Sequence, residues 1–240
     1  MSTPRAFTFV ELIVVLAIVL LLIGILLPTL GAARRTARCT QNSTPVRGIH
    51  SALVLFSQDN NKYYPGINKD GNRMEDYSTE YRFQALLDDN YFTGEYIISP
   101  SETKTAMTQT GIKPTIDNYS YAFLNISDLN AKRMAEWKDT SNSEAVVLSD
   151  RAIAVDDEGH FKSVHVNLKD NAKTLWQGSV GFNDNHVRYL HTYEVDTQYG
   201  DHSTENDNLF NTTNGSMVYS GNDNIIDTSY LQQAQSSNLP

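Results

Sequence analysis

One apolar segment near the amino terminus constrains this chain more than any other feature. Residues 7–30 span 24 positions and contain a single charged side chain, Glu11. As an α-helix the segment reaches about 36 Å, enough to cross a hydrocarbon core of about 30 Å. A cleaved secretory signal has an apolar region of only about 7–15 residues and then a small-residue cleavage site. The sequence therefore predicts a retained transmembrane helix, with a removed signal peptide as the alternative.

The charge of the chain is unevenly distributed. Residues 1–50 carry five arginines against one glutamate, a net charge of +4, so the remainder carries −13 within a total of −9. Such an acidic outer domain disfavours nucleic acid and anionic membrane surfaces as partners. Cys39 is the one cysteine of the sequence, which excludes an intramolecular disulfide and zinc sites built from cysteine pairs.

The position of Glu11 at the head of the apolar segment calls for a cationic partner. An ionised side chain at the middle of a bilayer costs about 2.5–3.5 kcal/mol, and less near the edge. Arg5 is one candidate partner. The other is the α-amine that a cut before Phe7 would create, on the same chain or on a neighbour packed alongside.

These residues carry a resemblance to a known family. A short basic leader, a small residue, then Phe7-Thr-Phe-Val-Glu11 and an apolar segment resemble the prepilin signal of type IV pilins and type II secretion pseudopilins. The resemblance implies cleavage by prepilin peptidase between Ala6 and Phe7, N-methylation of Phe7, and pairing of Glu11 with a neighbour's terminal amine during assembly. Pro28 becomes the twenty-second mature residue, where pilin helices often carry proline. The family usually has glycine in place of Ala6, which leaves open whether processing is slower.

The resemblance also implies an orientation. The positive charges of Arg34, Arg35 and Arg38, counted alone, would place the carboxyl side of the helix in the cytoplasm. The pilin pattern implies the opposite: a single-pass inner-membrane protein with its N-terminus in the cytoplasm and its head in the periplasm or outside the cell. Because the charge rule is statistical, we give precedence to the motif. The implied partners are prepilin peptidase, further copies of the chain, other pseudopilins and the inner-membrane assembly platform.

Beyond the apolar segment the helix is expected to continue as an amphipathic stem over residues 31–57. A bend or brief interruption is expected near 40–45, where Thr44 is a typical N-cap and Pro45 a typical first helical residue. Apolar residues then recur three and four positions apart, which predicts one buried helical face. This face consists of Val46, Ile49, Leu53 and Phe56.

The outer head, residues 58–240, is expected to fold as an α+β domain with a small antiparallel sheet. Local patterns predict a short helix over 82–90, strands over 118–124, 145–150 and 163–168, and a hairpin over 178–190 turning at Asp184-Asn185. With a leader at 1–6, the predicted fold is pilin-like: a long N-terminal helix, transmembrane in its first half and amphipathic in its second, packed on this head.

The order of these elements extends the resemblance over about residues 1–191. A Tyr-Pro pair, a Ser-Pro-Ser-Glu loop and a Phe-Asn-Asp-Asn-His-Val hairpin are similar to G-type pseudopilin-like proteins of the kind abundant in planctomycetes. In those proteins the hairpin usually carries a glycine where this chain has Asn185.

No catalytic motif is present in the sequence. A serine nucleophile elbow, a glycine-rich phosphate loop and an HExxH helix are all missing, so no catalytic residue and no enzyme activity are predicted. His165, His186 and Asp150 could meet across strands, although ordinary surface histidines are the simpler interpretation. The charged turn at 156–160, which includes His160, is likewise interpreted as solvated.

The carboxyl-terminal region is acidic and is the candidate metal site. Residues 194–240 contain no Lys or Arg, and their acids are interleaved with asparagine and glycine. Ca²⁺ takes 6–8 oxygen ligands, and the resemblance to G-type pseudopilins also implies calcium near the C-terminus. No EF-hand spacing exists, so the ligands stay unassigned, and a solvated acidic loop is the alternative. The calcium candidates are Asp196, Asp201, Asp207, Asp223 and Asp227.

Taken together, the sequence predicts a structural subunit of a type II secretion pseudopilus or a type IV pilus-like filament, assembled through its N-terminal helix. The alternative is a membrane-anchored extracytoplasmic enzyme or binding protein with a signal anchor. This alternative predicts that the chain is not cut after Ala6 and that it has a pocket with converging polar groups.

Overall fold

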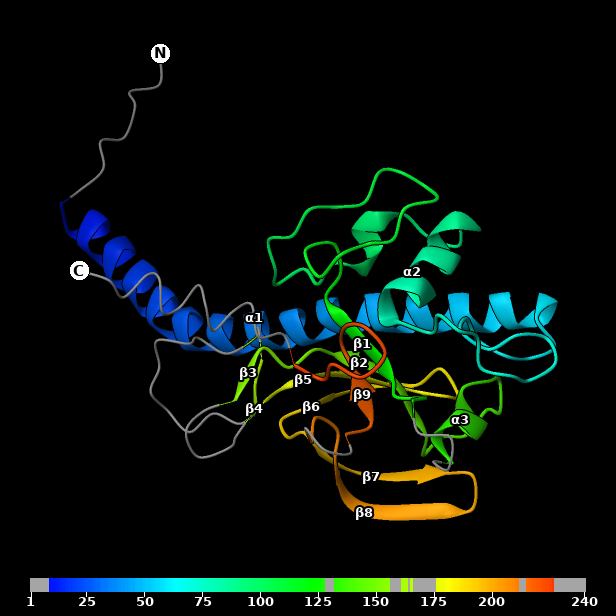
Figure 1. Cartoon of the computed structure of the whole chain (residues 1–240). Helices are drawn as coiled ribbons and strands as arrows, with labels where there is room; N and C mark the ends of the chain where they lie inside the picture. Colours follow the sequence, from blue (N-terminus) through cyan, green and yellow to red (C-terminus); the bar gives the residue numbers. More distant parts are fainter. Residues whose placement is uncertain are drawn as a thin grey trace, which may run out of the picture. The chain divides into compact units, whose positions relative to one another are not determined.

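A computed structural model of the chain describes residues 9–127, 132–155, 161–163, 165, 176–211 and 215–226. The chain forms two compact units, residues 1–40 and residues 41–240. Helix α1 (Phe9–Asp59) begins in the first unit and ends in the second (Figure 1). It continues through Pro45 without a break, so the interruption predicted near 40–45 is not present. One proline removes a single helical hydrogen bond, and the buried face that follows holds this part of the helix in place.

The predicted transmembrane half of the helix is corrected by the structure. In the first unit the side chains of residues 9–24 are exposed. Within the residues that the structure describes, no helix is long and apolar enough to cross a membrane. Residues 9–24, the apolar part whose side chains are described, reach about 24 Å, short of a hydrocarbon core of about 30 Å. The predicted single-pass inner-membrane localisation, with a cytoplasmic N-terminus and an outer head, is corrected with it.

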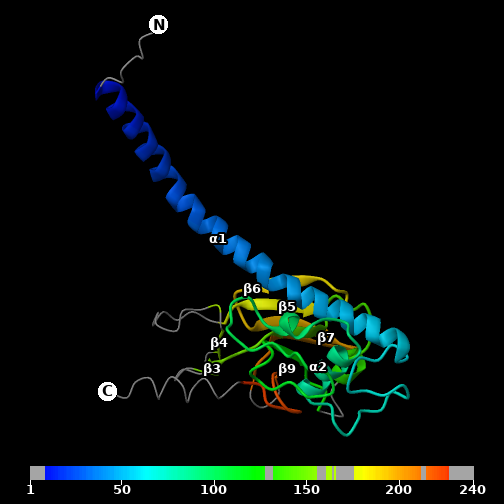
Figure 2. The same ribbon diagram turned by 90° about the horizontal axis from the view of Figure 1, so that it is seen from above.

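In the second unit, α1 packs the predicted face against a sheet. Val46, Ile49 and Leu53 are fully buried, and Phe56 packs against the same core. Ser43 Oγ lies 3.2 Å from Ser179 Oγ on the neighbouring strand. Figure 2 shows this part of α1 running along β5 and β6. The amphipathic half of the predicted helix is therefore confirmed, and it ends at Asp59.

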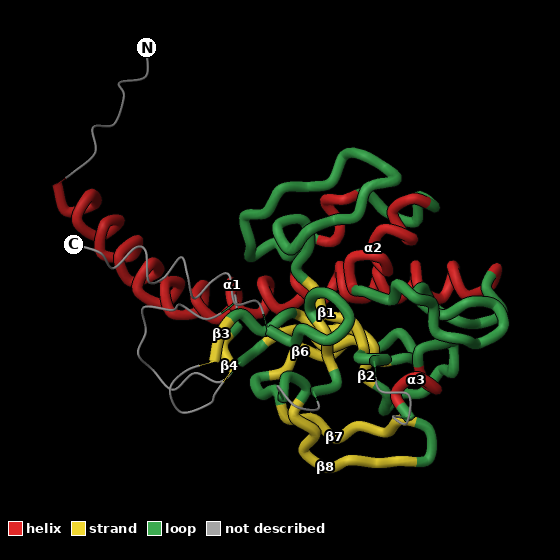
Figure 3. The backbone as a smooth tube through the Cα atoms, viewed as in Figure 1, coloured by secondary structure: helices red, strands yellow, loops and turns green. Residues whose placement is uncertain are grey.

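The sheet of the second unit has five antiparallel strands in the order β6-β5-β2-β1-β9. The α+β class with an antiparallel sheet is thus confirmed, as are strands near 118–124 and 145–150. Every residue of the central strands is buried, because helices and loops cover the sheet (Figure 3). The strands are β1 (Tyr121–Leu124), β2 (Val146–Asp150), β5 (Gly178–Phe182), β6 (Val187–Leu190) and β9 (Met217–Val218).

The hairpin between β5 and β6 lies where the sequence placed it, with a longer turn. The strands end at Phe182 and begin again at Val187, so four residues connect them instead of two. The N–H of Asn185 donates to Phe182 O at 3.0 Å, and the φ of Asn185 is 68°. This left-handed conformation suits asparagine and glycine, which explains why asparagine can occupy the position.

The remaining elements surround this sheet. Helix α2 (Thr79–Asp88) is capped by Ser78 Oγ, which accepts from the N–H of Tyr81 at 3.2 Å. The helix buries Phe83, Leu86 and Leu87, as predicted for 82–90. The other elements are the 3₁₀ helix η1 (Gly94–Ile97), α3 (Arg133–Glu136), β3 (Ala154–Val155), β4 (Phe161–Lys162), β7 (Glu194–Tyr199) and β8 (His202–Asn208).

The strands outside the main sheet form two small pairs, β3 with β4 and β7 with β8. The β7–β8 pair is a separate two-stranded ribbon in Figure 3. The predicted strand at 163–168 lies mostly outside the described residues, and its described members, Ser163 and His165, are not in a strand.

Candidate functional site

The predicted processing and assembly residues lie at the start of α1. Ala6 and Phe7 are outside the described residues. Glu11 lies in the first turn of α1 and is exposed. Pro28 is within α1, and only its backbone is described.

The apolar side chains around Glu11 are exposed on every side of the helix. Phe9 is 75% exposed and Leu20 is 68% exposed. Five consecutive residues, which together point in all directions around a helix, are each between 48% and 52% exposed: Leu12, Ile13, Val14, Val15 and Leu16. A helix that is apolar all round is normally buried by other protein or by lipid, so this surface needs a cover.

A second candidate centre joins His165 to Asp150 in the second unit. His165 Nε2 lies 2.9 Å from Asp150 Oδ2, and the N–H of Ser179 donates to the same oxygen at 2.6 Å. Strand β2 supplies the aspartate and β5 supplies the serine. The structure therefore brings His165 and Asp150 together, although His165 lies in a turn, and a functional role for the pair stays a prediction. His186 does not join them, since its Nδ1 contacts Asp184 Oδ1 at 2.5 Å.

The other ring nitrogen of His165 faces two residues that the sequence did not single out. His165 Nδ1 lies 3.1 Å from Asn42 Nδ2 and 3.2 Å from Ser101 Oγ. Ser101 Oγ in turn lies 3.3 Å from Asn42 Oδ1. No short-range pattern links Asn42, on α1, to the loop residue Ser101 and the turn residue His165, which lie far along the chain.

Serine, histidine and aspartate in a row are the residue types of nucleophilic catalysis. Here, however, Asn42 Nδ2 lies beside His165 Nδ1 and competes with the Ser101 hydroxyl for this nitrogen while the ring is neutral. The Asn42 carbonyl oxygen takes the hydroxyl of Ser101. The arrangement ties α1, β2 and the loop at residue 101 together, and it is best explained as a structural network.

Charged side chains next to His165 shift its pKa. Burial lowers the pKa of His165, but the hydrogen bond and charge of Asp150 and the charge of Glu102 outweigh it, so the pKa is raised above its usual value. Glu102 pairs with Arg151, and both side chains are almost completely buried. Arg151 Nε donates to Glu102 Oε1 at 3.2 Å.

The calcium candidates that the structure describes contact different partners. Asp196 Oδ1 accepts from the N–H of Asn206, Asp207 Oδ2 accepts from Thr197 and Ser216, and Asp201 pairs with Lys132. Asp223 is exposed in a turn, and Asp227 lies outside the described residues, as does the charged turn at 156–160. Among the described residues, no group of three or more His, Cys, Asp or Glu is placed to hold a metal ion.

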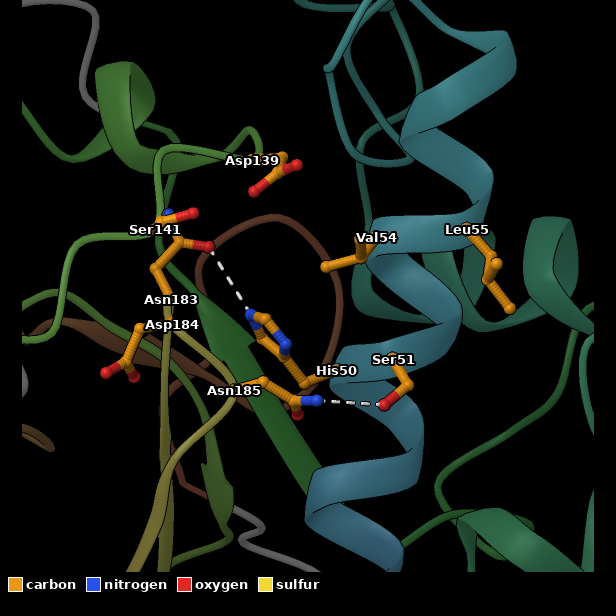
Figure 4. Close-up of a pocket in the computed structure, with 9 residues that line it drawn as sticks. All are labelled: His50, Ser51, Val54, Leu55, Asp139, Ser141, Asn183, Asp184 and Asn185. Atoms are coloured by element: carbon orange, nitrogen blue, oxygen red, sulfur yellow. Dashed lines mark hydrogen bonds between the residues drawn. The ribbon is translucent and has the colours of Figure 1, made fainter.

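A cavity that the sequence did not indicate opens beside α1 in the second unit (Figure 4). Its volume is about 450 Å³, within the range of small-molecule sites. Helix α1, the loop after α3 and the β5–β6 turn each contribute to its wall. The lining residues are His50, Ser51, Val54, Leu55, Asp139, Ser141, Asn183, Asp184 and Asn185.

Comparison of the chain with protein-family models, curated proteins and solved structures found no match. The pseudopilin resemblance therefore stays a prediction that rests on the motifs of the sequence.

Proposed function

We propose that this chain is a structural subunit of a filament of the type II secretion pseudopilus or type IV pilus kind, joined to its neighbours through the apolar part of α1. The observation that carries the proposal is the exposure of apolar side chains on all sides of residues 9–23. Full burial of one Val, Leu, Ile or Phe side chain contributes about 1.5–3 kcal/mol. Helices from several copies, packed side by side, would cover this surface.

The second unit supports the same assignment, because it does not use residues 9–23 for its own folding. Its buried apolar core begins with Val46 on α1 and is completed by α2, the sheet and the C-terminal strands. The apolar part of α1 is therefore available for contacts with other molecules.

In the proposed filament, Glu11 aligns each helix with the helix of the neighbouring subunit. It is the one charged residue between Arg5 and Arg34 in the sequence. An ionised carboxylate inside a bundle of apolar helices needs a cation close by. In the proposed filament that cation is the N-methylated amine of Phe7 of a neighbouring subunit, exposed when prepilin peptidase cuts after Ala6. The partners are thus the peptidase, other copies of the chain and related pseudopilins.

Catalysis and calcium are not part of the proposal. In the Ser101–His165–Asp150 group, the serine hydroxyl donates to Asn42 Oδ1, so the group is not arranged as a nucleophile and its base. The calcium candidates that the structure describes contact different partners, as given above.

Two measurements test the proposal. Intact-mass analysis of the native protein should find a chain that starts at N-methylated Phe7. A start at Met1 would reject processing and favour an enzyme or binding protein.

Substitution of Glu11 tests assembly separately. Glu11→Gln keeps the size of the side chain and removes its charge. Because loss of one partner of a buried ion pair costs about 3–5 kcal/mol, we expect filament yield to fall by at least about ten-fold. Glu95→Gln, an exposed acid of the second unit, is the matched control and should assemble normally. Normal filaments from Glu11→Gln would contradict the pairing.

A further inference from the structure

The cavity beside His50 is lined by polar side chains whose roles are settled by the hydrogen bonds around them. The orientation of the Asn183 amide is settled first. Its Nδ2 donates to the carbonyl oxygens of Glu136 and Lys138, at 2.8 and 2.9 Å, so its Oδ1 must face the other way. That Oδ1 accepts from Tyr64 Oη at 2.8 Å and lies 3.4 Å from His50 Nε2. Since Asn183 Oδ1 is an acceptor, His50 Nε2 carries the hydrogen.

The other ring nitrogen of His50, Nδ1, is therefore left without a hydrogen. The residue is 1% exposed, and burial lowers its pKa, although the side chains of Asn183 and Asn185 and the charges of Asp139 and Asp184 act in the opposite direction. In the neutral ring, with the hydrogen on Nε2, Nδ1 is an acceptor. Nδ1 has no hydrogen-bond partner among the described residues.

Asn185 leaves a second bare acceptor in the same cavity. Ser51 Oγ donates to the carbonyl oxygen of Arg47 at 3.0 Å, so it can only accept from Asn185 Nδ2, which lies 3.1 Å away. This fixes the amide, and Asn185 Oδ1 is then buried without a hydrogen-bond partner among the described residues. Figure 4 shows the Asn185–Ser51 contact next to the ring of His50.

The charged residues that line the cavity are hydrogen-bond acceptors as well. Asp139 and Asp184 line the cavity, and none of the described residues that line it is Lys or Arg. Burial raises the pKa of Asp184, but hydrogen bonds from the backbone and ring of His186 outweigh this effect and lower it, so Asp184 stays ionised. The two polar atoms left without a partner are therefore both acceptors, and the two charged residues of the lining are both acids. Val54 adds an apolar wall on α1.

We infer that this cavity binds a cationic hydrogen-bond donor at the end of an alkyl chain, that is, an ammonium or guanidinium group such as a lysine or arginine side chain carries. An ammonium brings three donors and a guanidinium five, and neither brings an acceptor. Such a group would satisfy His50 Nδ1 and Asn185 Oδ1 together and would neutralise Asp139, while its alkyl stem contacts Val54. An anionic ligand is repelled by the same atoms. A metal ion is disfavoured, because no cluster of metal-binding side chains exists among the described residues.

Titration calorimetry with the full chain tests the inference. The probes are Nα-acetyl-lysine amide and Nα-acetyl-arginine amide, and the control is Nα-acetyl-norleucine amide, which has an alkyl side chain without the charge. We expect saturable binding of at least one cationic probe and none of the control. Absence of binding by both cationic probes, or equal binding of norleucine amide, would overturn the inference.

Two variants locate the binding site. Asp139→Asn removes one charge and keeps the shape of the side chain. Asn185→Gly removes the amide, and glycine tolerates the φ of 68° at this position. A hydrogen bond to a charged group contributes about 1.5–3 kcal/mol, so each variant should weaken binding by about ten-fold or more. Asp70→Asn, an exposed acid that does not line the cavity, should bind as the unmodified chain does. Unchanged affinity in both cavity variants would refute the assignment, provided that thermal unfolding shows them folded.

The source of the cation is a separate question, which a peptide can answer. A peptide of residues 31–40 carries Arg34, Arg35 and Arg38 of this chain. Binding of this peptide that is weakened by Asp139→Asn would support the site and identify a second copy of the chain as the source. If the peptide fails and the small probes bind, the site stands and its ligand comes from elsewhere. Neither result depends on filament formation.

Discussion

His165 Nε2 lies 2.9 Å from Asp150 Oδ2, and the two side chains are only 4% and 1% exposed. The contact couples the stability of the second unit to pH, because the histidine and the aspartate are both withdrawn from water. Asp150, Glu102 and the buried Arg151 are the charged groups around this ring.

The first prediction follows from this contact. The pKa of His165 is raised in the folded chain above its usual value of about 6.5. The folded state therefore binds more protons, and the stabilisation is fully present below pH 6.5 and lost as the pH rises through the folded-state pKa. We expect the unfolding free energy of the unmodified chain, relative to His165→Gln, to fall between pH 6 and pH 8. A difference that does not change with pH in urea unfolding would contradict this. His202→Gln, at an exposed position, is the control.

His50 should show the opposite dependence. Burial lowers its pKa below the usual value of about 6.5. The unfolded state then binds more protons in the window below pH 6.5, so stability contributed by neutral His50 is lost as the pH falls through the folded-state pKa. His50→Gln keeps a donor for Asn183 and does not titrate. We expect the stability difference between the unmodified chain and this variant to shrink on acidification from pH 7 to pH 5, which urea unfolding at each pH would measure.

Three glycines provide a graded test of packing. A Cβ at Gly94 would lie 2.3 Å from the carbonyl oxygen and 2.6 Å from the nitrogen of Met107, so the backbone must move. At Gly48 it would meet the hydroxyl end of the Tyr96 side chain, which can shift more easily. Overpacking costs about 1–3 kcal/mol. We expect Gly94→Ala to reach the upper end of this range or exceed it and Gly48→Ala to cost less. Thermal unfolding would measure both, and an equal loss would contradict the ranking.

Gly24 in the first unit is the control for this series. Nothing lies within 4 Å of a Cβ added there. Alanine at a helical position gains about 0.5–1 kcal/mol over glycine. This gain concerns the first unit, so Gly24→Ala should leave the unfolding of the second unit unchanged.

The buried pair of Glu102 and Arg151 should be costly to break from one side. Their side chains are 6% and 1% exposed. Arg151→Met leaves the carboxylate of Glu102 buried with Lys104 Nζ, 3.9 Å away, as its remaining cation, so we expect a loss at or below the low end of about 3–5 kcal/mol. The double variant Arg151→Met, Glu102→Leu should recover much of this loss. Lys132→Met breaks the exposed pair with Asp201 and should leave the unfolding midpoint unchanged. Chemical unfolding of the four chains checks the ordering.

Local patterns predicted the elements that depend on near neighbours. The spacing of Val46, Ile49 and Leu53 predicted the buried face of α1, and that of Phe83 and Leu86 predicted α2. The β5–β6 hairpin was predicted because its turn residues favour positive φ. The transmembrane prediction, which used the hydrophobicity of the whole segment, was corrected because no described helix combines the length and the apolar character needed to span a bilayer.

The sequence by itself determined the long N-terminal helix, the class of the head and the charge imbalance, because periodicity, turn chemistry and composition act over a few residues. The tertiary structure decided which strands pair, that Asn42 and Ser101 meet His165, and that two orphan acceptors share one cavity with Asp139. These contacts join residues separated by tens of positions or more. Their energies depend on burial and on the direction of each hydrogen bond, which exist only once the chain has folded.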